Sequence, residues 1–322
     1  MRFDMRAPAT GAPADQLYQA ALEMAAWAEG RGGLAAIVCE HHTMSDGYLP
    51  SPLILATAMA ARTTTLPISV AIVTLPLYDP VRLAEEMIVL DIVSRGRVSY
   101  VAAIGYVPDE YALFGVDFTR RGRIAEEKLA VLLAAKTGEP FEHDGRTIHV
   151  TPPPFTPGGP HVAWGGGSEP AARRAGRHGL DFFAQGGGPT LADAYADEAR
   201  AHGHEPGVCM VPPADMTTTM FVSDDLDRAW EELGPYLMND VRSYAAINRG
   251  NDHTASLSFV STADELRAED RSHRIVTVDQ AVAVARSGVP LPLHPLIGGL
   301  PPEIAWGYLE TVADQVVPQL AG

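Results

Sequence analysis

The chain has 322 residues and a formal net charge of −16 at pH 7, with 24 Lys+Arg against 40 Asp+Glu. Apolar residues make up 46% and charged residues 20%, a balance typical of a folded globular protein and not of a disordered one. Because a chain this acidic has no general electrostatic attraction for phosphate backbones or anionic lipids, we expect neither nucleic acid nor a membrane as a partner.

Short β-branched runs alternate with longer amphipathic stretches along the chain. The runs that predict strands lie at residues 2–6, 35–39, 68–74, 97–103, 161–164, 181–185, 218–222 and near 291–293. This alternation predicts a parallel sheet, because parallel strands need crossover connections. In a chain of this length, the alternation favours a single (β/α)8 TIM barrel of the α/β class over an open doubly wound sheet. It predicts one domain over residues 1–322. The proline-rich stretch 141–160 is interpreted as an insertion after strand four.

Several helices have recognisable start signals. Asp79-Pro80 places an N-cap residue before a proline at the first helical position, and residues 190–193 and 262–265 both match the capping-box pattern. Ser168 and the proline pair at 301–302 are expected to open two more helices. The polar stretch 246–274 lacks clear periodicity and favours a loop or lid.

Cysteines and targeting signals limit the remaining classes. Cys39 and Cys209 are too few and too far apart to predict a disulfide framework or a zinc site, and no metal is expected. The first residues lack the apolar stretch of a signal peptide. The longest apolar run, at residues 66–77, is shorter than the roughly 18 residues that span a bilayer. The sequence therefore predicts a cytoplasmic protein.

The first candidate for chemistry is Glu40-His41-His42, directly after the second predicted strand. In a barrel of this kind, active sites lie just beyond the carboxyl ends of the strands. Because successive side chains of an extended chain point to opposite sides, His41 and His42 are not expected to face one metal ion. From the residues alone, a hydrogen-bonded rim histidine and a functional one remain equally open.

Two glycine-rich turns form the second candidate. Residues 164–168 read Trp-Gly-Gly-Gly-Ser, and residues 185–190 repeat the arrangement one unit later. Glycines let backbone N–H groups approach an anion, and a helix N-terminus adds a favourable partial charge. Either turn alone fits a simple tight connection equally well, but two on adjacent units favour a phosphate site. Neither matches the dinucleotide fingerprint or the P-loop.

These motifs, taken in order, resemble the bacterial luciferase-like family of flavin-dependent monooxygenases, whose members are (β/α)8 barrels. The stretches that carry the resemblance are Cys39-Glu40-His41-His42 and residues 69–73, 79–86, 90–97, 114–117, 121–123 and 298–302. Each motif is weak alone, whereas their order and spacing are specific.

The resemblance implies roles for particular residues. His41 matches the first histidine of the family's Glu-His-His motif, a catalytic acid/base beside the flavin. A non-proline cis peptide is expected at Val70–Ala71, against the flavin ring. The cofactor-binding residues that the resemblance implies are Val70, Ala71, Ala103, Gly105, Tyr106, Gly166, Gly167 and Ser168. Met44, Tyr48 and Tyr78 are expected to line an apolar substrate pocket.

This chain also departs from luciferase. Ile104 stands where luciferase has an arginine that contacts the flavin phosphate, and Ala103 stands where luciferase has its reactive cysteine. Arg121 and Arg173 are candidates to replace the missing cation. Light emission is not implied.

The resemblance implies an enzyme that uses reduced FMN and O2 to oxygenate a small apolar organic substrate through a flavin C4a-hydroperoxide. A separate reductase would supply the reduced flavin, and a homodimer is expected.

One alternative is an F420-dependent oxidoreductase that transfers hydride. The chain's two lysines, Lys128 and Lys136, disfavour it, because the polyanionic tail of F420 needs cationic partners. A catalytically inert flavin-binding homologue and a metal-dependent hydrolase using His41 or His42 with Asp46 remain open. The substrate itself is not predicted.

Overall fold

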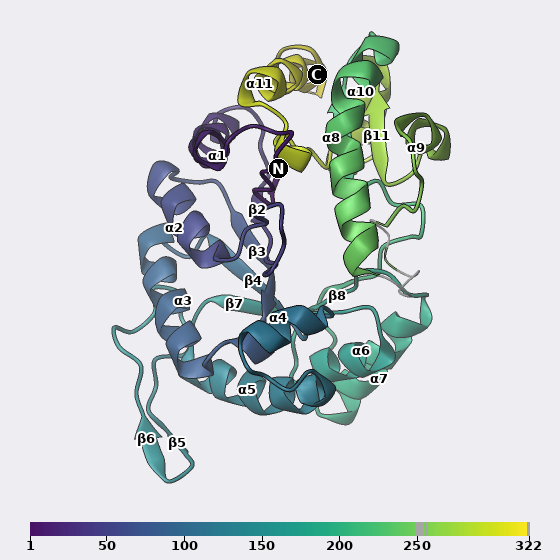
Figure 1. Cartoon of the computed structure of the whole chain (residues 1–322). Helices are drawn as coiled ribbons and strands as arrows, with labels where there is room; N and C mark the ends of the chain where they lie inside the picture. Colours follow the sequence, from purple (N-terminus) through teal and green to yellow (C-terminus); the bar gives the residue numbers. More distant parts are fainter. Residues whose placement is uncertain (249–253, 255–256, 321–322) are drawn as a thin grey trace. The chain divides into compact units, whose positions relative to one another are not determined.

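The computed structural model describes residues 1–248, 254 and 257–320. It separates into two compact units (Figure 1). The first contains residues 1–37, 44–50 and 213–322, and the second contains residues 38–43 and 51–212. Strands and helices alternate, so the predicted α/β class is confirmed, while one domain over residues 1–322 stays a prediction. Among the described residues, every helix is too short or too polar to span a bilayer.

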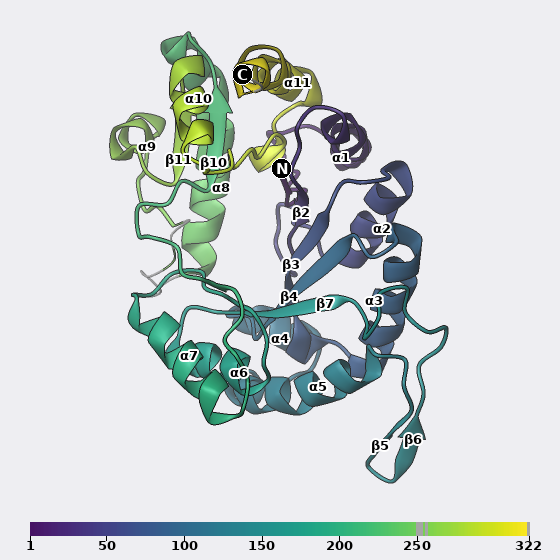
Figure 2. The same cartoon turned by 180° about the vertical axis from the view of Figure 1, so that it is seen from behind.

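The second unit is built on a parallel sheet. Its strands follow the order β3 (Ile68–Thr74), β4 (Val98–Ala103), β7 (His161–Gly165), β8 (Phe182–Phe183) and β9 (Cys209–Met210). Strand β4 is buried along almost its whole length, as expected for a parallel strand covered on both faces. The helices after these strands are α2 (Pro52–Arg62), α3 (Pro80–Ser94), α4 (Pro108–Leu113), α5 (Arg121–Ala135), α6 (Glu169–Arg177) and α7 (Thr190–Ala201). Figure 2 shows α2, α3 and α5 along one side of β3 and β4.

Short elements complete the second unit. Single turns of 3₁₀ helix, η1 (Leu75–Leu77) and η2 (Phe118–Arg120), follow β3 and α4. After α5, the chain forms an antiparallel hairpin of β5 (Phe141–His143) and β6 (Arg146–Ile148), which stands away from α3 and α5 (Figures 1 and 2). The stretch 141–160 thus has a two-stranded ribbon of its own between β4 and β7.

The first unit joins the two ends of the chain. Its elements are β1 (Arg2–Phe3), α1 (Ala14–Glu29), most of β2 (Ala36–Val38), β10 (Thr219–Val222), α8 (Leu226–Ile247), α9 (Ala263–Glu269), β11 (His273–Val276), α10 (Val278–Arg286), η3 (Ile297–Gly299), α11 (Pro302–Thr311), η4 (Val312–Val316) and η5 (Val317–Leu320). Strands β10 and β11 pair in parallel, with Thr219 opposite His273. Valines of β10, β11 and α10 pack with Val312 and Val316 into one apolar cluster.

Most predicted start signals are confirmed. The Asp79 carboxylate accepts hydrogen bonds from the backbone N–H groups of Val81 and Arg82 at 3.0 and 2.9 Å, and Thr262 forms a complete capping box with Glu265. The capping box predicted at Thr190 is wrong, because Pro189 occupies the N-cap position of α7 and makes no side-chain cap.

The sequence missed four strands, β5, β6, β9 and β11, and misread one loop. Strands β9 and β11 have only two and four residues and no clear flanking signal. The expected loop at 246–274 contains α9 and the start of β11, and its residues 249–253 and 255–256 lie outside the described residues. The last predicted strand is reduced to one bridge, between Met220 and Leu293.

Candidate functional site

Strand β3 is irregular in its second half. Its register against β4 shifts between Ala71 and Val73, and the peptide between Ala71 and Ile72 is cis. The expected position of the cis bond, Val70–Ala71, is therefore wrong by one residue. Residues 70–73 are all apolar, so a motif match along this strand does not fix the register to a single peptide.

The carboxyl ends of β3, β4 and β7 approach one another closely, because glycines stand where side chains would collide. A Cβ on Gly165 would lie 3.0 Å from Val101 Cγ1 and 3.6 Å from both Ala103 Cβ and Ile72 Cγ2. A Cβ on Gly105 would lie 2.7 Å from the Thr74 methyl, and Gly105 has a φ of +69°. The predicted residues Ala103 and Gly105 thus lie beside the irregular part of β3.

His41 and His42 follow the carboxyl end of β2 and bind different carboxylates. Nδ1 of His41 lies 2.7 Å from Oε1 of Glu110, and Nε2 of His42 lies 3.0 Å from Oε1 of Glu40. Both histidines are 8% exposed, while Glu110 and Glu40 are 1% and 2% exposed. The two rings contact different carboxylates, and that they do not share a metal ion stays a prediction.

Two tyrosines extend these histidine–glutamate pairs. The hydroxyl of Tyr106 lies 3.1 Å from Nε2 of His41, and the hydroxyl of Tyr78 donates to Oε2 of Glu40 at 2.9 Å. Burial, together with the negative charge of Glu40, raises the pKa of Tyr78 far above its usual value. Tyr78 is therefore a hydrogen-bond donor fixed on a carboxylate at neutral pH.

Glu110 is the site residue that sequence reasoning missed. It lies in the first turn of α4, and its Oε1 also accepts the backbone N–H of His42 at 2.9 Å. The available signal was an acidic residue in the first turn after strand four, the edge of the sheet where functional groups gather.

The two glycine turns lie next to each other, as the phosphate reading requires. A Cβ on Gly167 would lie 3.9 Å from the carbonyl oxygen of Gly186, and one on Gly187 would lie 3.5 Å from that of Gly167. Gly166 has a φ of +148°, and Ser168 is the N-cap residue of α6. Gly167 and Ser168 are exposed, so this helix end is open to a ligand.

The two arginines proposed to replace the phosphate cation differ in their surroundings. Arg173 is paired with Glu169 at 2.7 Å and with Glu198 at 3.2 Å. The Arg121 guanidinium lies over the Phe118 ring, 4.0 Å from its centroid, and donates to the Phe118 carbonyl. Among the described residues Arg121 has no ion pair of this kind, so we prefer it as the candidate.

The remaining predicted pocket residues belong to both units. Tyr78 is in the second unit, while Met44 and Tyr48 are in the first. Tyr48 is 3% exposed, and its hydroxyl lies 2.8 Å from that of Tyr244. Asp46, the carboxylate of the metal-hydrolase alternative, is paired with Arg6 and accepts from Ser243 at 3.0 Å.

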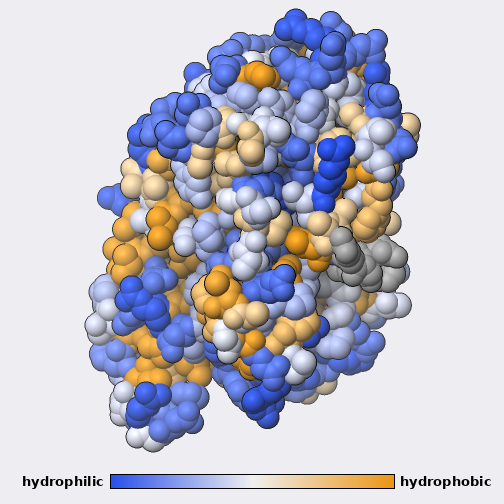
Figure 3. Space-filling model, in the orientation of Figure 1, coloured by the Kyte–Doolittle hydropathy of each residue, from blue (hydrophilic) through white to orange (hydrophobic). Residues whose placement is uncertain are grey.

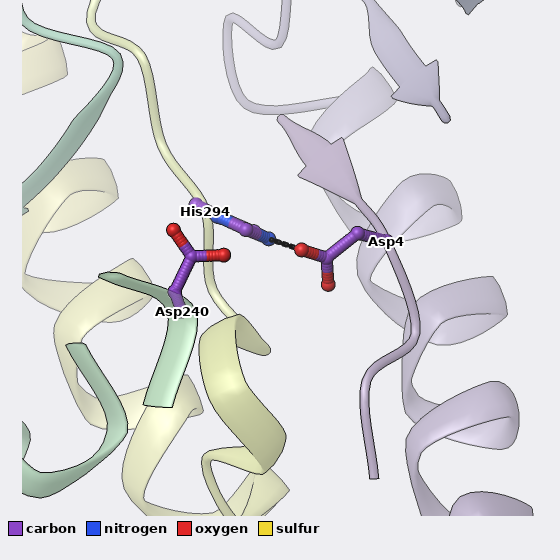
Figure 4. A group of neighbouring side chains, drawn as sticks. All are labelled: Asp4, Asp240 and His294. Carbon is purple, nitrogen blue, oxygen red and sulfur yellow. Dashed lines mark ion pairs between the residues drawn. The ribbon is translucent and has the colours of Figure 1, made fainter. Parts of the chain in front are cut away.

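The first unit contains a buried group of possible metal ligands. Ligand atoms of Asp4, Asp240 and His294 lie within 4.8 Å of one another, and Nε2 of His294 is 3.3 Å from Oδ2 of Asp4. Figure 4 shows the His294 ring beside Asp240, with its ion pair to Asp4. All three residues are at most 2% exposed.

Arg6 already supplies the cation of this group. Its Nε lies 3.3 Å from Oδ2 of Asp4 and 3.4 Å from Oδ1 of Asp240. A divalent ion between the same oxygens would meet a fixed positive charge in a region of low dielectric. Burial alone would raise the pKa of Asp4, but His294 and Arg6 hold it well below its usual range. We therefore interpret the group as a buried ion-pair cluster.

Comparison with known proteins agrees with this geometry. A family model described as luciferase-like monooxygenase matches residues 1–287. The oxygenase component of a flavin-dependent trigonelline monooxygenase from Acinetobacter baylyi is 31% identical over 133 residues, which are 40% of this chain and 36% of that protein. Limonene 1,2-monooxygenase from Rhodococcus erythropolis is 29% identical over 120 residues, 35% of this chain and 31% of that protein. The matches thus span only about a third of these relatives' length.

Solved structures show the same fold along almost the whole chain. A monooxygenase from Streptomyces bottropensis has a TM-score of 0.77 at 20% identity, covering 99% of this chain and 98% of that one. The oxygenating constituent of 3,6-diketocamphane monooxygenase from Pseudomonas putida, in complex with FMN, has a TM-score of 0.67 at 18% identity, covering 98% and 99%. An F420-dependent secondary alcohol dehydrogenase has a TM-score of 0.61 at 18% identity, covering 84% and 85%. The family match over most of its length shows that this chain belongs to the luciferase-like monooxygenases, enzymes of the TIM-barrel class.

Proposed function

We propose that this chain is the oxygenase component of a two-component system, which uses reduced FMN and O2 to oxygenate a small apolar organic substrate. The observation that carries the proposal lies within the second unit. There, His41, which is bound to a buried carboxylate, follows the carboxyl end of a parallel strand. Two adjacent glycine turns follow the ends of two more. The trigonelline relative, named as an oxygenase component, and the diketocamphane enzyme with FMN support the same assignment.

The residues present fit a flavin. Gly105 and Gly165 let the ends of β3, β4 and β7 approach one another closely, and we assign the flat ring to these ends. Backbone N–H groups of Gly166, Gly167 and Ser168 at the start of α6 would hold the phosphate. Val70, Ala71, Ala103 and Tyr106 are the further residues that we assign to the cofactor site.

When bound, FMN supplies the electrons and activates O2. The chain's own contribution is a proton relay and a site from which water is excluded. Glu110 orients His41 through Nδ1, which leaves Nε2 as the nitrogen that gives or takes a proton. Met44, Tyr48 and Tyr78 stay our predicted lining of the substrate pocket.

Anaerobic titration with reduced FMN and, separately, with reduced F420 tests the cofactor assignment, because the F420-dependent neighbour keeps that alternative open. We expect saturable binding of reduced FMN and weaker binding of F420. Turnover of a substrate panel with O2 and a separate reductase then distinguishes an oxygenase from an inert flavin-binding homologue. Tight binding of F420 with hydride transfer, or a stoichiometric metal without flavin binding, would contradict the proposal.

The Gly166→Ala variant is expected to weaken FMN binding by roughly tenfold, or about 1.4 kcal/mol. Gly166 has a φ of +148°, which is unfavourable for a residue with a side chain, and a Cβ there would lie 2.7 Å from the Cβ of Ala171. The turn and its backbone N–H groups must therefore move in the variant. Quenching of flavin fluorescence gives the Kd. Gly307→Ala, where a Cβ meets nothing within 4 Å, is the matched control and should leave the Kd unchanged. Equal FMN affinities of Gly166→Ala and Gly307→Ala would show that this turn does not bind the phosphate.

We also propose a homodimer through α2 and α3. Ile54 on α2 is 73% exposed, and Val89, Ile92 and Val93 on α3 are 50%, 39% and 43% exposed. Figure 3 shows an apolar area over this side of the second unit. The two helices pack side by side, so their apolar residues form one surface, and a second copy related by two-fold symmetry would cover it with the same residues.

Val93→Asp is expected to raise the dimer dissociation constant by about thirtyfold or more, because it buries an unpaired charge in the interface at a cost of at least about 2 kcal/mol. Light scattering after size exclusion gives the mass at each concentration. Val289→Asp, at an exposed valine of the first unit, is expected to leave the dimer intact. A monomeric wild-type protein at all concentrations would disprove the dimer.

A further inference from the structure

We propose that Lys128 is a positioning residue for the substrate pocket and that it acts through Tyr78. This inference rests on the proposed function, in which Tyr78 lines the pocket. Lys128 lies on α5, which packs against η1, and both elements belong to the second unit. Its Nζ donates to the carbonyl oxygens of Pro76 and Tyr78 at 2.7 and 2.6 Å. One side chain of α5 therefore holds the segment that follows β3.

The two carbonyl groups belong to the end of a single helical turn. The turn η1 covers Leu75–Leu77, and the backbone N–H of Tyr78 donates to the Leu75 carbonyl at 3.1 Å. The last carbonyl groups of a helical turn have no donor within it and carry a partial negative charge. A lysine nitrogen has several N–H groups on a long stem, so one nitrogen can reach two such oxygens. Lys128 thus caps this turn from a neighbouring helix.

Tyr78 is held at both of its ends. Its carbonyl oxygen accepts from Lys128, and its hydroxyl donates to Oε2 of Glu40 at 2.9 Å. Glu40 is 2% exposed, and its Oε1 lies 3.0 Å from Nε2 of His42. Its Oε2 also lies 3.4 Å from the backbone nitrogen of Thr74, at the end of β3. Because the hydroxyl is anchored on a buried carboxylate, the direction of the Tyr78 ring depends on where Lys128 holds the backbone.

The chain's other lysine makes a similar bond at a different place. Lys136 is the C-cap residue of α5, and its Nζ donates to the carbonyl oxygen of Gly158 at 2.8 Å. Burial lowers the pKa of both lysines, but a lysine nitrogen donates in its charged and its neutral form alike. Lys128 and Lys136 are the only lysines in the sequence. The chain thus offers a matched pair on one helix, one bound to the segment after β3 and one to the stretch 141–160.

Carbon-13 NMR of full-length protein labelled at the tyrosine Cζ, without added flavin, tests whether Lys128 positions Tyr78. Tyr78→Phe identifies the resonance. We expect Lys128→Met to shift it, because the hydroxyl of a displaced ring meets Glu40 at a different distance and angle. Lys136→Met should leave it in place. An unchanged Tyr78 resonance in Lys128→Met, or an equal shift in Lys136→Met, overturns the proposal.

Steady-state kinetics with reduced FMN, O2 and the panel substrate that turns over fastest test the effect on the pocket. Lys128→Met is expected to raise KM by about tenfold, a change that corresponds to one or two ordinary hydrogen bonds. The kcat and the Kd for reduced FMN should stay within about twofold of wild type, because the variant changes a pocket wall and not the proton transfer at His41. Lys136→Met should keep the wild-type KM. A fall in kcat with an unchanged KM overturns the proposal.

Chemical rescue separates positioning from a general loss of structure. Lys128→Cys treated with bromoethylamine regains a side chain of the length of lysine, and its KM should return to within about twofold of wild type. Wild-type protein treated in parallel controls for alkylation of Cys39 and Cys209. A KM that stays raised after treatment contradicts the proposal. If no panel substrate is oxygenated, the proposed function fails, while the NMR result still decides whether Lys128 positions Tyr78.

Discussion

His41→Ala is expected to lower the rate of substrate oxygenation by about 10²- to 10⁴-fold, the range that a positioned acid/base group contributes. The affinity for reduced FMN should stay within about twofold of wild type, because the removed group acts on a proton and not on the phosphate or the ring. Stopped-flow mixing of the reduced-FMN complex with O2 and substrate measures the step directly. The fall should appear in kcat and kcat/KM together.

The control for this prediction is a histidine outside the site. His161 is exposed at the start of β7, where it pairs with Asp181 at 3.0 Å, and His161→Ala should keep full turnover. Full oxygenation by His41→Ala with normal flavin binding would show that His41 is a structural residue. Loss of flavin binding in the same variant would instead move His41 from proton transfer to cofactor binding.

The sequence was sufficient for the parts of the site that local patterns encode. His41 directly follows a β-branched run and the glycine turns follow short apolar runs, so their place at the carboxyl edge of the sheet follows from the strand pattern. Glu110 is 69 residues from His41, and nothing in either segment states that they meet. Their pairing depends on how residues 38–43 and α4 are brought together within the second unit.

Short strands and buried charges were harder to predict, because neither leaves a clear pattern in the local sequence. Strand β9 has two residues, so it lacks the length over which a periodic pattern is detectable. At the N-terminus, Phe3 and Met5 alternate with Asp4 and Arg6, a pattern that predicts a strand with one polar, exposed face. In the structure Asp4 and Arg6 are as buried as Phe3 and Met5. Their partner Asp240 comes from α8, far along the chain.

The buried cluster around Arg6 gives the second large expected effect. Arg6 is fully buried, pairs with Asp4, Asp46 and Asp240, and lies over the rings of two tyrosines. Arg6→Met keeps much of the side-chain volume but leaves three carboxylates without their central cation. Removing one partner of a buried ion pair typically costs about 3–5 kcal/mol. We expect the free energy of unfolding to fall by this amount at pH 7.

Urea unfolding followed by tryptophan fluorescence measures this loss mainly in the first unit, because Trp27, Trp230 and Trp306 belong to it and only the fourth tryptophan, Trp164, belongs to the second. Arg82→Met is the matched control. Arg82 forms exposed ion pairs with Glu85 and Glu86 on α3, and such pairs contribute at most about 1 kcal/mol. A cost of Arg6→Met no larger than that of the control would mean that the carboxylates are held by other groups.

The pH dependence of the free energy of unfolding is an independent test of the same prediction. Burial alone would raise the pKa values of Asp4 and Asp240, but His294 acting on Asp4, His273 acting on Asp240, and Arg6 acting on both lower them. A carboxylate whose pKa is lower in the folded state stabilises the fold above its unfolded pKa of about 4, and this contribution is lost as the pH falls further. In Arg6→Met that contribution is already reduced at pH 7. The gap in unfolding free energy between wild type and variant should therefore narrow below about pH 4, whereas a gap due only to lost side-chain packing would stay constant.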